Sequence, residues 1–351
     1  MLSKRLTDAI HFLLQGQKDF SVTKLPGDAS NRSYYRLHTT KQSYIVMVLA
    51  ETGANSLAEE VTKVSRVVTE LPFIDIQRYL SHKGVKVPHL FGYDEKHGVL
   101  LLEDLGDQLL LEATQTAAPA QIQRWYETAL GQLECLAIIS CEDLKQSIAF
   151  SRSFDEDLYN WEFLHFVEYG LDHRLKKPPK NHDRDKIVSS LKEITREYLS
   201  WEKVFCHRDY HSRNLLVFDS QIAVIDFQDA LLAPLFYDLA SLLRDSYFAL
   251  EDSLQDTLVE SYRKQMASHG LAKTSSREEF RRAFDLMGLH RNLKAAGRFC
   301  YIDQVKGNRK YLADVPRTLR YVKKTLERYK DLITLKNTLF PYIDDIIESC
   351  Q

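Results

Sequence analysis

The sequence has little cysteine, no long apolar run and no excess of charge of either sign. Its five cysteines, at positions 135, 141, 206, 300 and 350, include no C-x-x-C pair. An odd and sparse set in a chain of 351 residues argues against a disulfide scaffold or a zinc knuckle. Reduced thiols are therefore expected, as in a cytoplasmic protein.

Net charge and hydropathy argue against two further classes of protein: those that bind nucleic acid or an anionic membrane, and those that span a membrane. The formal net charge is −2, so the chain lacks the basic field that a nucleic acid or an anionic membrane attracts. No stretch approaches the roughly 18 apolar residues of a membrane span. Near the N-terminus, Asp8 and His11 interrupt the apolar stretch, which favours an amphipathic helix over a signal peptide. We expect a cytoplasmic protein with no nucleic-acid or membrane partner.

The spacing of apolar residues changes near residue 103. Before this point, β-like runs are expected at 22–25, 34–38, 44–49, 89–93 and 99–103, with helices at 56–68 and 75–83. After it, helices are expected at about 119–139, 154–169, 185–200, 235–249, 252–268, 277–304, 314–330 and 335–349, with a β island at 204–206, 215–218 and 222–225. The pattern predicts an α+β fold with a β-rich N-terminal lobe (1–103) and a larger helical lobe (104–351).

The most specific motif lies in the β island. Residues 207–214 read HRDYHSRN, which fits the kinase catalytic-loop pattern H-R-D-x-x-x-x-N. In such a loop Asp209 accepts or orients the proton of the attacking hydroxyl, while Asn214 reaches a metal ion. The motif predicts a two-lobed, protein-kinase-like fold and phosphoryl transfer from a nucleotide to a hydroxyl group.

A further acid follows the next apolar strand. Asp226 ends the run AVID and is expected to hold Mg²⁺ between two phosphates, because a hard cation takes oxygen ligands. Gln228 stands where the related D-F-G motif has glycine. Taken singly, each acid can also end a strand or cap a turn. The order of Asp209, Asn214 and Asp226, each beside its own short strand, favours the catalytic interpretation.

Asp238 has a different expected role. It lies near a predicted helix start, in the run PLFYDLA. In kinase-like folds an acid at this place hydrogen-bonds the catalytic loop, so we expect a structural function. Stabilisation of the helix N-terminus is the alternative.

The N-terminal lobe contains a candidate phosphate loop between two expected strands. Its residues Gly27, Asp28 and Ser30 leave main-chain N–H groups accessible to phosphate oxygens, and Arg32 adds a charged fork. An ordinary hairpin turn is the alternative. We therefore expect ATP or GTP to bind here.

The segment LLLEDLG at 100–106 is the candidate hinge between the lobes. Main-chain groups of Glu103 and Leu105 are expected to pair with adenine. The alternative is a buried edge strand that ends at a glycine turn.

One position departs from the kinase pattern. Kinases carry a lysine on the third strand that meets the α- and β-phosphates, whereas the corresponding run here ends in Met47. The missing charge is expected from Arg32, Arg36 or Lys41. The alternative is a catalytically weak, pseudokinase-type binding module.

Three runs together resemble the aminoglycoside phosphotransferase family. They are VFCHRDYHSRN at 204–214, VIDFQDA at 224–230 and YDLASLLRD at 237–245. The resemblance implies a kinase-like fold, ATP or GTP with Mg²⁺, and a small-molecule acceptor. Other acceptors of this chemistry are an aminoglycoside, choline, homoserine or a nucleoside.

Within that family the chain is most similar to the bacterial N-acetylmuramate/N-acetylglucosamine kinases of cell-wall recycling. The similar segments are 27–32, 46–47, 211–214, 227–230, 290–294 and 311–317. The resemblance implies phosphorylation of the anomeric hydroxyl of an amino sugar, in a subgroup that also lacks the strand lysine.

The acceptor residues are the least determined part of the site. Arg213, Asp229 and Arg244 are candidates for contacts with sugar hydroxyls or a carboxylate, and local ion pairs are the alternative. His290 and Arg291, with Tyr301, form a helix-spaced polar set that is expected to line the acceptor pocket. A pocket for an aminoglycoside is expected to be rich in carboxylates.

Overall fold

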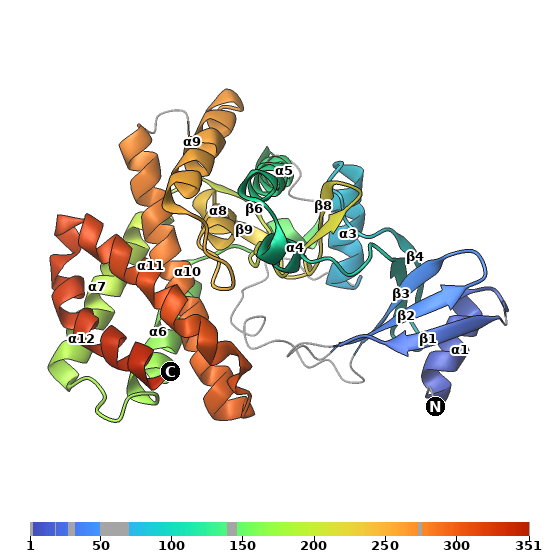
Figure 1. The fold of residues 1–351 in the computed structure, drawn as a ribbon, viewed down its shortest axis with the longest axis horizontal. Helices are drawn as coiled ribbons and strands as arrows, with labels where there is room; N and C mark the ends of the chain where they lie inside the picture. Colours follow the sequence, from blue (N-terminus) through green and yellow to red (C-terminus); the bar gives the residue numbers. More distant parts are fainter. Residues whose placement is uncertain are drawn as a thin grey trace.

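The protein consists of a small sheet-containing lobe beside a larger helical lobe (Figure 1). The computed structural model describes residues 3–17, 19–26, 32–49, 70–138, 146–272 and 276–350. The helix expected at 56–68 and the loop residues Gly27, Asp28 and Ser30 lie outside these ranges. The two-lobed α+β organisation is the one that the apolar spacing predicts.

The N-terminal lobe is an antiparallel sheet with the strand order β1-β2-β3-β5-β4. The five expected strands are confirmed within three residues at each end. They are β1 (Phe20–Lys24), β2 (Ser33–Thr39), β3 (Ser43–Val48), β4 (Leu90–Asp94) and β5 (Val99–Glu103).

The two faces of this sheet have different neighbours because side chains alternate along a strand. Val46 and Leu101 pair across β3 and β5 and pack with Ile10 of α1 (Lys4–Leu13). The next pair along, Met47 and Leu100, points to the other face and joins the core shared with the helical lobe. Helix α3 (Pro72–His82) contributes to that same core.

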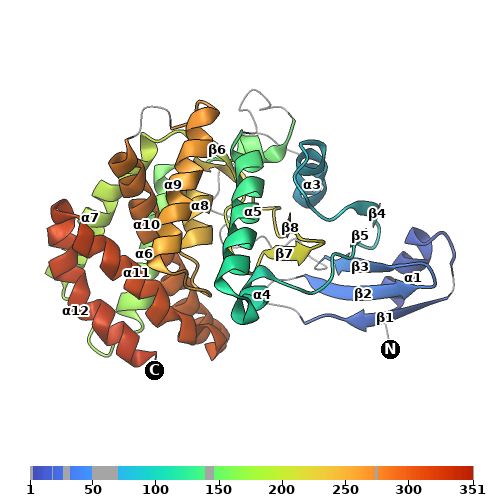
Figure 2. The same ribbon diagram turned by 45° about the horizontal axis from the view of Figure 1, so that its top comes forward.

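The linker after β5 is fixed to the sheet by an arginine fork. Arg36 of β2 donates to both carboxylate oxygens of Asp104 (2.7 and 3.0 Å) and of Asp107 (both 2.7 Å). The chain then forms α4 (Leu110–Thr116) and α5 (Pro119–Ile138), which lie between the sheet and the helices that follow α5 in the chain (Figure 2). The fork thus connects the two lobes where the hinge is expected.

Helix α10 (Arg277–Lys306) runs through the centre of the helical lobe. It begins at a capping box between Ser276 and Glu279 and ends at Gly307, whose φ of 67° suits glycine. It packs against α6, α8 and α11. The other helices are α6 (Glu156–Phe166), α7 (Asn181–Leu199), α8 (Phe236–Leu243), α9 (Asp252–Ser268), α11 (Val315–Arg328) and α12 (Ile333–Ser349).

Shorter elements complete the lobe. Two-stranded ladders are formed by β6 (Lys203–Cys206) with β9 (Leu231–Pro234) and by β7 (Leu215–Phe218) with β8 (Gln221–Val224). Short helical segments are the 3₁₀ helices at Ile148–Ser151, Arg309–Asp314 and Lys330–Leu332 and the π-helix at Val167–Asp172.

The structure differs from the expected elements at three places. Helix α4 and strand β9 were not expected from the sequence, because each is only a few residues long and its apolar run has no clear period. The helix expected over 235–249 ends at Leu243, since Arg244 leaves the helical region with φ −119° and ψ 44°. The break releases Arg244 and Asp245 from helical geometry beside the catalytic loop.

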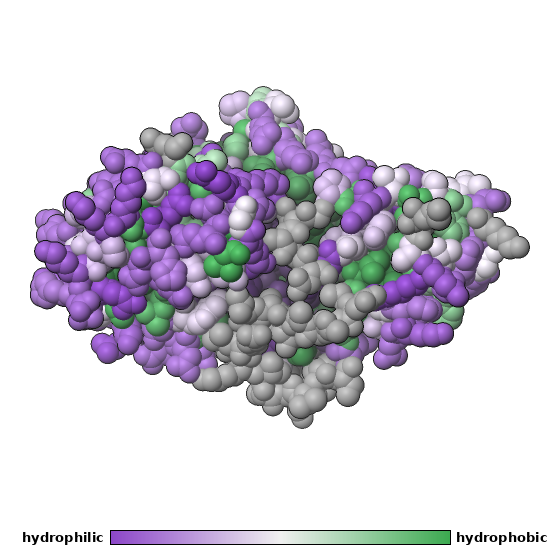
Figure 3. All heavy atoms as spheres, turned by 90° about the horizontal axis from the view of Figure 1, so that it is seen from below, coloured by the Kyte–Doolittle hydropathy of each residue, from purple (hydrophilic) through white to green (hydrophobic). Residues whose placement is uncertain are grey.

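The described surface of the helical lobe is largely polar in the view of Figure 3. Hydrophilic residues dominate the described part of the helical lobe in this view, and apolar residues appear in small separate spots. None of the described helices combines the length and the apolar character of a membrane span.

Candidate active site

Two carboxylates after β9 hold the catalytic loop. Asp238 accepts the main-chain N–H of His207 at 2.6 Å and that of Arg208 at 3.0 Å. Asp245 accepts the N–H of Ser212 at 2.8 Å. Arg208 has a φ of 80°, an unfavourable conformation for a residue with a side chain, and the Asp238 bonds stabilise it there. The structure therefore places Asp238 against the loop, in the contact that we expected from the sequence.

Asp209 lies at the tip of this loop, with its side chain 39% exposed. Both Nη atoms of Arg291 lie 3.2 Å from its Oδ1, and Lys294 Nζ lies 3.5 Å from the same oxygen. Burial opposes ionisation, but Lys294 and Arg291 outweigh it and hold the pKa of Asp209 well below its usual range. Asp209 is thus a carboxylate at neutral pH.

The Asp209 contacts are one-sided. Every hydrogen bond that its carboxylate makes with the described residues goes to Oδ1. Within that part of the chain, Oδ2 has no donor. One oxygen is therefore held by cations while the other has no donor among the described residues, which suits an atom that meets an acceptor hydroxyl.

Asn214 and Asp226 lie beside Asp209. Asn214 donates from Nδ2 to the Asp209 carbonyl at 2.9 Å, and its own carbonyl accepts the N–H of Ile225 at 3.0 Å. These two bonds join the catalytic loop to the segment that ends in Asp226. His207 reinforces the junction, because its Nε2 donates to the Ile225 carbonyl at 2.9 Å. The three residues predicted to carry the chemistry are thus neighbours.

The oxygen donors of this junction suit a magnesium ion. Asp226 has a left-handed φ of 64° and a side chain that is 45% exposed, and its Oδ1 accepts Gln228 Nε2 at 3.0 Å. Burial raises the pKa of Asp226. In the described ranges no three His, Cys, Asp or Glu side chains form a ready metal site. Mg²⁺ characteristically takes one or two protein oxygens and fills its shell with water and phosphates, so this donor set fits.

On the N-terminal side, Arg32 is the candidate cation that reaches the junction. Its Nη1 lies 3.5 Å from Asp226 Oδ1. Arg36 is committed to the linker fork, and Lys41 lies in the exposed turn at the far end of β2. Met47 is fully buried in the core. Of the three cations considered for the missing lysine, the structure brings Arg32 to the catalytic acids.

The hinge residues lie at the end of β5. The Glu103 N–H is used inside the sheet, where it donates to the His89 carbonyl at 2.8 Å. The Glu103 carboxylate accepts Lys86 Nζ at 3.1 Å. The Glu103 N–H is therefore not available to adenine, and the predicted contact is left to the Glu103 carbonyl and the main chain of Leu105, whose side chain is buried.

A cavity of about 100 Å³ adjoins Asp209, and we call it the acceptor cavity. Two predicted residues, Arg244 and Arg291, lie on its wall together with Lys294 and Arg298. Its acids are Asp209 and Asp245, and burial raises the pKa of Asp245 to about 6. The remaining lining residues are His211, Ser241, Ser246, Tyr247, Asn292, Ala295 and Phe299. The cavity is therefore richer in cations than in carboxylates.

Other predicted acceptor residues do not line this cavity. His290 is completely buried and lies 2.8 Å through Nε2 from Glu162, so its side chain is part of the core. Arg213 stacks on the Tyr247 and Tyr311 rings at 4.8 and 5.4 Å. Asp229 accepts Gln228 Nε2 at 3.2 Å. For these three residues the alternative expectation, local contacts that support the site, agrees with the geometry.

Sequence reasoning missed Lys294 and Glu162. Lys294 lies one helical turn after Arg291 in α10, so its spacing gave a usable signal. Glu162 is fully buried in α6, where it accepts Arg208 Nη2 at 3.4 Å and lies 3.3 Å from Lys294. Nothing in the run around Glu162 distinguishes it from a solvent-exposed helical glutamate. The contacts of Glu162 connect α6 to the catalytic loop and to α10.

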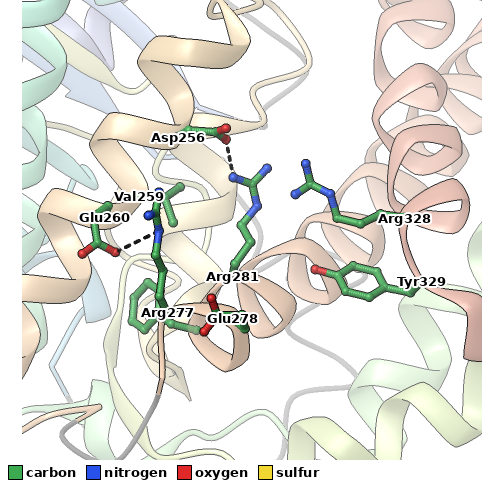
Figure 4. Close-up of a pocket in the computed structure, with 9 residues that line it drawn as sticks. Asp256, Val259, Glu260, Arg277, Glu278, Arg281, Arg328 and Tyr329 are labelled. Atoms are coloured by element: carbon green, nitrogen blue, oxygen red, sulfur yellow. Dashed lines mark hydrogen bonds and ion pairs between the residues drawn. The ribbon is translucent and has the colours of Figure 1, made fainter.

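A second and wider cavity, of about 400 Å³, lies between α9, α10 and α11 (Figure 4). Its arginines are paired with acids: Arg281 with Asp256, and Arg328 with Asp285 at 2.9 Å. None of the predicted catalytic residues lines it. Its size alone assigns it no role in the chemistry.

Known proteins are similar to this sequence over most of its length. The N-acetylmuramate/N-acetylglucosamine kinase of Neisseria meningitidis is 29% identical over 331 residues, which cover 94% of this chain and 92% of that protein. The kinase of the same name from Pseudomonas aeruginosa is 30% identical, over 89% of this chain and 86% of that protein.

Solved structures share the fold at lower identity. A putative aminoglycoside phosphotransferase from Ralstonia eutropha superposes with a TM-score of 0.63 at 12% identity, covering 92% of this chain and 97% of that one. A choline kinase from Streptococcus pneumoniae gives 0.56 at 17% identity, over 93% and 100%. These likenesses confirm the predicted kinase-like fold.

The family profile described as "Phosphotransferase enzyme family" matches residues 21–273, a range that contains the β-sheet lobe, the catalytic loop and Asp226. The match and the two kinases agree with the chemistry that the HRDYHSRN loop predicts. On these grounds the chain belongs to the phosphotransferase enzyme family.

Proposed function

We propose that the protein transfers the γ-phosphoryl group of ATP or GTP to the anomeric hydroxyl of N-acetylmuramate and N-acetylglucosamine. The observation that carries this proposal is the junction of Asp209, Asn214 and Asp226, which opens toward a cation-lined acceptor cavity. The names of relatives that match about nine-tenths of the chain support the choice of sugar. We also propose that the enzyme works in the cytoplasm, where the nucleotide is available.

The nucleotide is proposed to bind between the lobe of residues 1–103 and the lobe of residues 104–351. Glu103 and Leu105 meet the adenine, while the phosphate loop and Arg32 meet the phosphates. Asn214 and Asp226 hold Mg²⁺, whose charge neutralises the triphosphate oxygens. The 3.5 Å approach of Arg32 to Asp226 supports this arrangement, since both groups address the same phosphates from opposite lobes.

Asp209 is proposed to orient the acceptor hydroxyl through Oδ2. Its depressed pKa makes it a weak base, so its main effect is positioning rather than complete proton removal. Phosphoryl transfer depends chiefly on positioning and charge stabilisation, and an anomeric hydroxyl is more acidic than an ordinary alcohol. A weak base is therefore sufficient for this acceptor.

The charge of the acceptor cavity argues against two alternatives. An aminoglycoside carries several ammonium groups and choline a quaternary one, and both are expected to require carboxylates or aromatic cages. The acceptor cavity instead has Arg244, Arg291, Lys294 and Arg298 on its wall, and its carboxylate Asp209 is already paired with Arg291 and Lys294. The pseudokinase alternative is disfavoured by the intact acids and by Arg32, which supplies a cation where Met47 does not.

The test is an acceptor panel with the purified full-length chain and magnesium nucleotide. N-acetylmuramate, N-acetylglucosamine, kanamycin, choline and homoserine are each incubated with ATP or GTP, and ³¹P NMR identifies the product. A sugar 1-phosphate resonance coupled to the anomeric proton is expected. The alditol of N-acetylglucosamine, which lacks the anomeric hydroxyl, should not react at that position. Faster phosphorylation of kanamycin or choline would overturn the proposal.

A further inference from the structure

We infer that the acceptor cavity contains a carboxylate subsite at Arg298, which makes the enzyme favour an acceptor that carries an acid group beside its sugar ring. This inference rests on the proposed function, because it assumes an amino-sugar acceptor with its reacting hydroxyl at Asp209. It adds a specificity-determining residue that the catalytic loop does not reveal.

Three cations of α10 share one face of the helix. Arg291, Lys294 and Arg298 are separated by three and four residues, so they lie along one face of the helix. All three line the acceptor cavity. Arg291 and Lys294 contact Asp209, whereas Arg298 lies one turn further along the helix. The cavity wall is thus a row of cations that starts at the catalytic carboxylate and continues away from it.

Arg298 has no acid partner in the part of the chain that the structure describes. The other cavity cations are neutralised: Arg244 by Asp285, Arg291 by Asp209, and Lys294 by Asp209 and Glu162. Across the described ranges, no carboxylate lies within salt-bridge distance of Arg298. Its guanidinium lies over the Tyr301 ring at 4.9 Å, which orients it without neutralising its charge.

The unpaired charge of Arg298 affects the pKa of a neighbouring histidine. His165 packs against Tyr301 at a ring separation of 5.3 Å. Burial and the charge of Arg298 lower the pKa of His165 to about 4. A half-buried arginine that faces a cavity without a counter-ion is suited to bind a planar anion through two parallel N–H bonds.

Arg298 lies one helical turn beyond the residues of α10 that contact Asp209. Four residues along a helix correspond to a rise of about 6 Å. An acceptor that places its reacting hydroxyl at Asp209 therefore meets Arg298 with a group on the other side of its ring. In N-acetylmuramate the lactyl ether on C3 carries a carboxylate on that side, and in N-acetylglucosamine a hydroxyl occupies the position. The acid should bind Arg298, while the neutral sugar leaves it without an anion.

The experiment compares three acceptors: N-acetylmuramate, its lactyl carboxamide and N-acetylglucosamine. With the wild-type chain, kcat/KM for the acid should exceed that for the carboxamide by roughly ten- to a hundredfold, as expected for charge-assisted hydrogen bonds. Arg298→Gln should reduce this ratio to about one, mainly through KM, and Arg298→Lys should retain part of it. Arg309→Gln, on an arginine whose side chain is 79% exposed, is the matched control and should keep the ratio.

The outcomes separate the inference from the proposed function. Equal rates for the acid and the carboxamide in the wild-type chain would reject the carboxylate subsite while sugar phosphorylation stands. An unchanged ratio in a folded Arg298→Gln variant would reject Arg298 as its residue. Failure to phosphorylate any of the three sugars would remove the proposed function as well. If Arg298→Gln does not fold, the wild-type comparison and Arg298→Lys still decide.

Discussion

Arg32 Nη1 lies 3.5 Å from Asp226 Oδ1, although the two residues are 194 positions apart in the sequence. The contact brings a guanidinium of the small lobe to the acid that we propose for magnesium. A bound triphosphate presents oxygens that compete for Arg32, so the ion pair and the nucleotide use the same group. We therefore propose that Arg32 takes the part of the strand lysine that this sequence lacks.

Replacement of Arg32 should weaken nucleotide binding. Arg32→Met is expected to raise KM for the magnesium nucleotide by roughly tenfold or more, since a charge-assisted contact with phosphate is lost. Steady-state kinetics at saturating sugar, with the nucleotide Kd from calorimetry, provide the measurement. Lys41→Met removes an exposed cation at the other end of β2 and should leave both constants near their original values. An unchanged KM in Arg32→Met would exclude a phosphate role.

Restoring the kinase lysine at its usual place should not help this protein. Met47 is fully buried beside Leu100 and Leu102, so Met47→Lys places an unpaired ammonium in an apolar core. The free energy of unfolding in urea should fall by roughly 3–5 kcal/mol, with no gain in kcat. Met47→Leu conserves volume and should lose less than about 1.5 kcal/mol. Higher activity in Met47→Lys would show that this side chain reaches the nucleotide.

Asp209 should control turnover rather than nucleotide binding. Asp209→Asn removes the carboxylate that orients the acceptor hydroxyl, and kcat should fall by roughly 10²–10⁴-fold. The nucleotide Kd should stay within about threefold, because the contacts of Asp226 and Arg32 remain. Asp219→Asn, in the exposed turn between β7 and β8, is the matched control, and asparagine tolerates its φ of 46°. Near-normal turnover of Asp209→Asn would remove Asp209 from its proposed role.

Asp285 should be essential for stability. It is fully buried and accepts Arg281 Nε at 3.0 Å, Arg328 Nη1 at 2.9 Å and a further bond from Arg244. Asp285→Asn leaves these cations without their counter-charge, so the free energy of unfolding should fall by roughly 3–5 kcal/mol.

A matched carboxylate provides the control for Asp285. Asp256 binds the same Arg281 but has a side chain that is 49% exposed, so Asp256→Asn should lose less than about 1 kcal/mol. Equal losses in the two variants, measured by urea unfolding, would contradict the claim that burial makes Asp285 the more important partner.

Stability should fall in mild acid, in part through His165. Burial and the nearby Arg298 lower the pKa of His165 from 6.5 to about 4. The unfolded chain binds a proton below pH 6.5 that the folded chain refuses until about pH 4, so this stability is present above 6.5 and is lost as the pH falls. The slope from one group is at most about 1.4 kcal/mol per pH unit.

Urea midpoints at several pH values between 7 and 4 test this prediction. His165→Gln should flatten the dependence, and the difference between the variant and the wild type removes the contribution of other groups. His182→Gln, on an exposed histidine near the start of α7, is the control. A His165→Gln curve that runs parallel to the wild type would assign the acid sensitivity to other residues.

Local sequence determined the catalytic loop and most of the elements around it. The spacing of Asp209 and Asn214, and the apolar strand before Asp226, are short-range patterns, and the strands of the small lobe follow from alternation along a few residues. These features can be recognised from the sequence because each depends on a single turn, strand or helix face. They were sufficient to predict the fold class and phosphotransferase chemistry.

Only the tertiary structure decided which charges meet. The contact of Lys294 with Asp209 joins residues 85 positions apart. The burial of Glu162 depends on the packing of α6 against α10. His290 is buried on the same helix that presents Arg291 to the site. The helix period fixes which residues share a face, but the packing of that helix fixes what the face touches. Long-range packing also decided that Met47 is core and that Arg32, from the small lobe, brings its charge to Asp226.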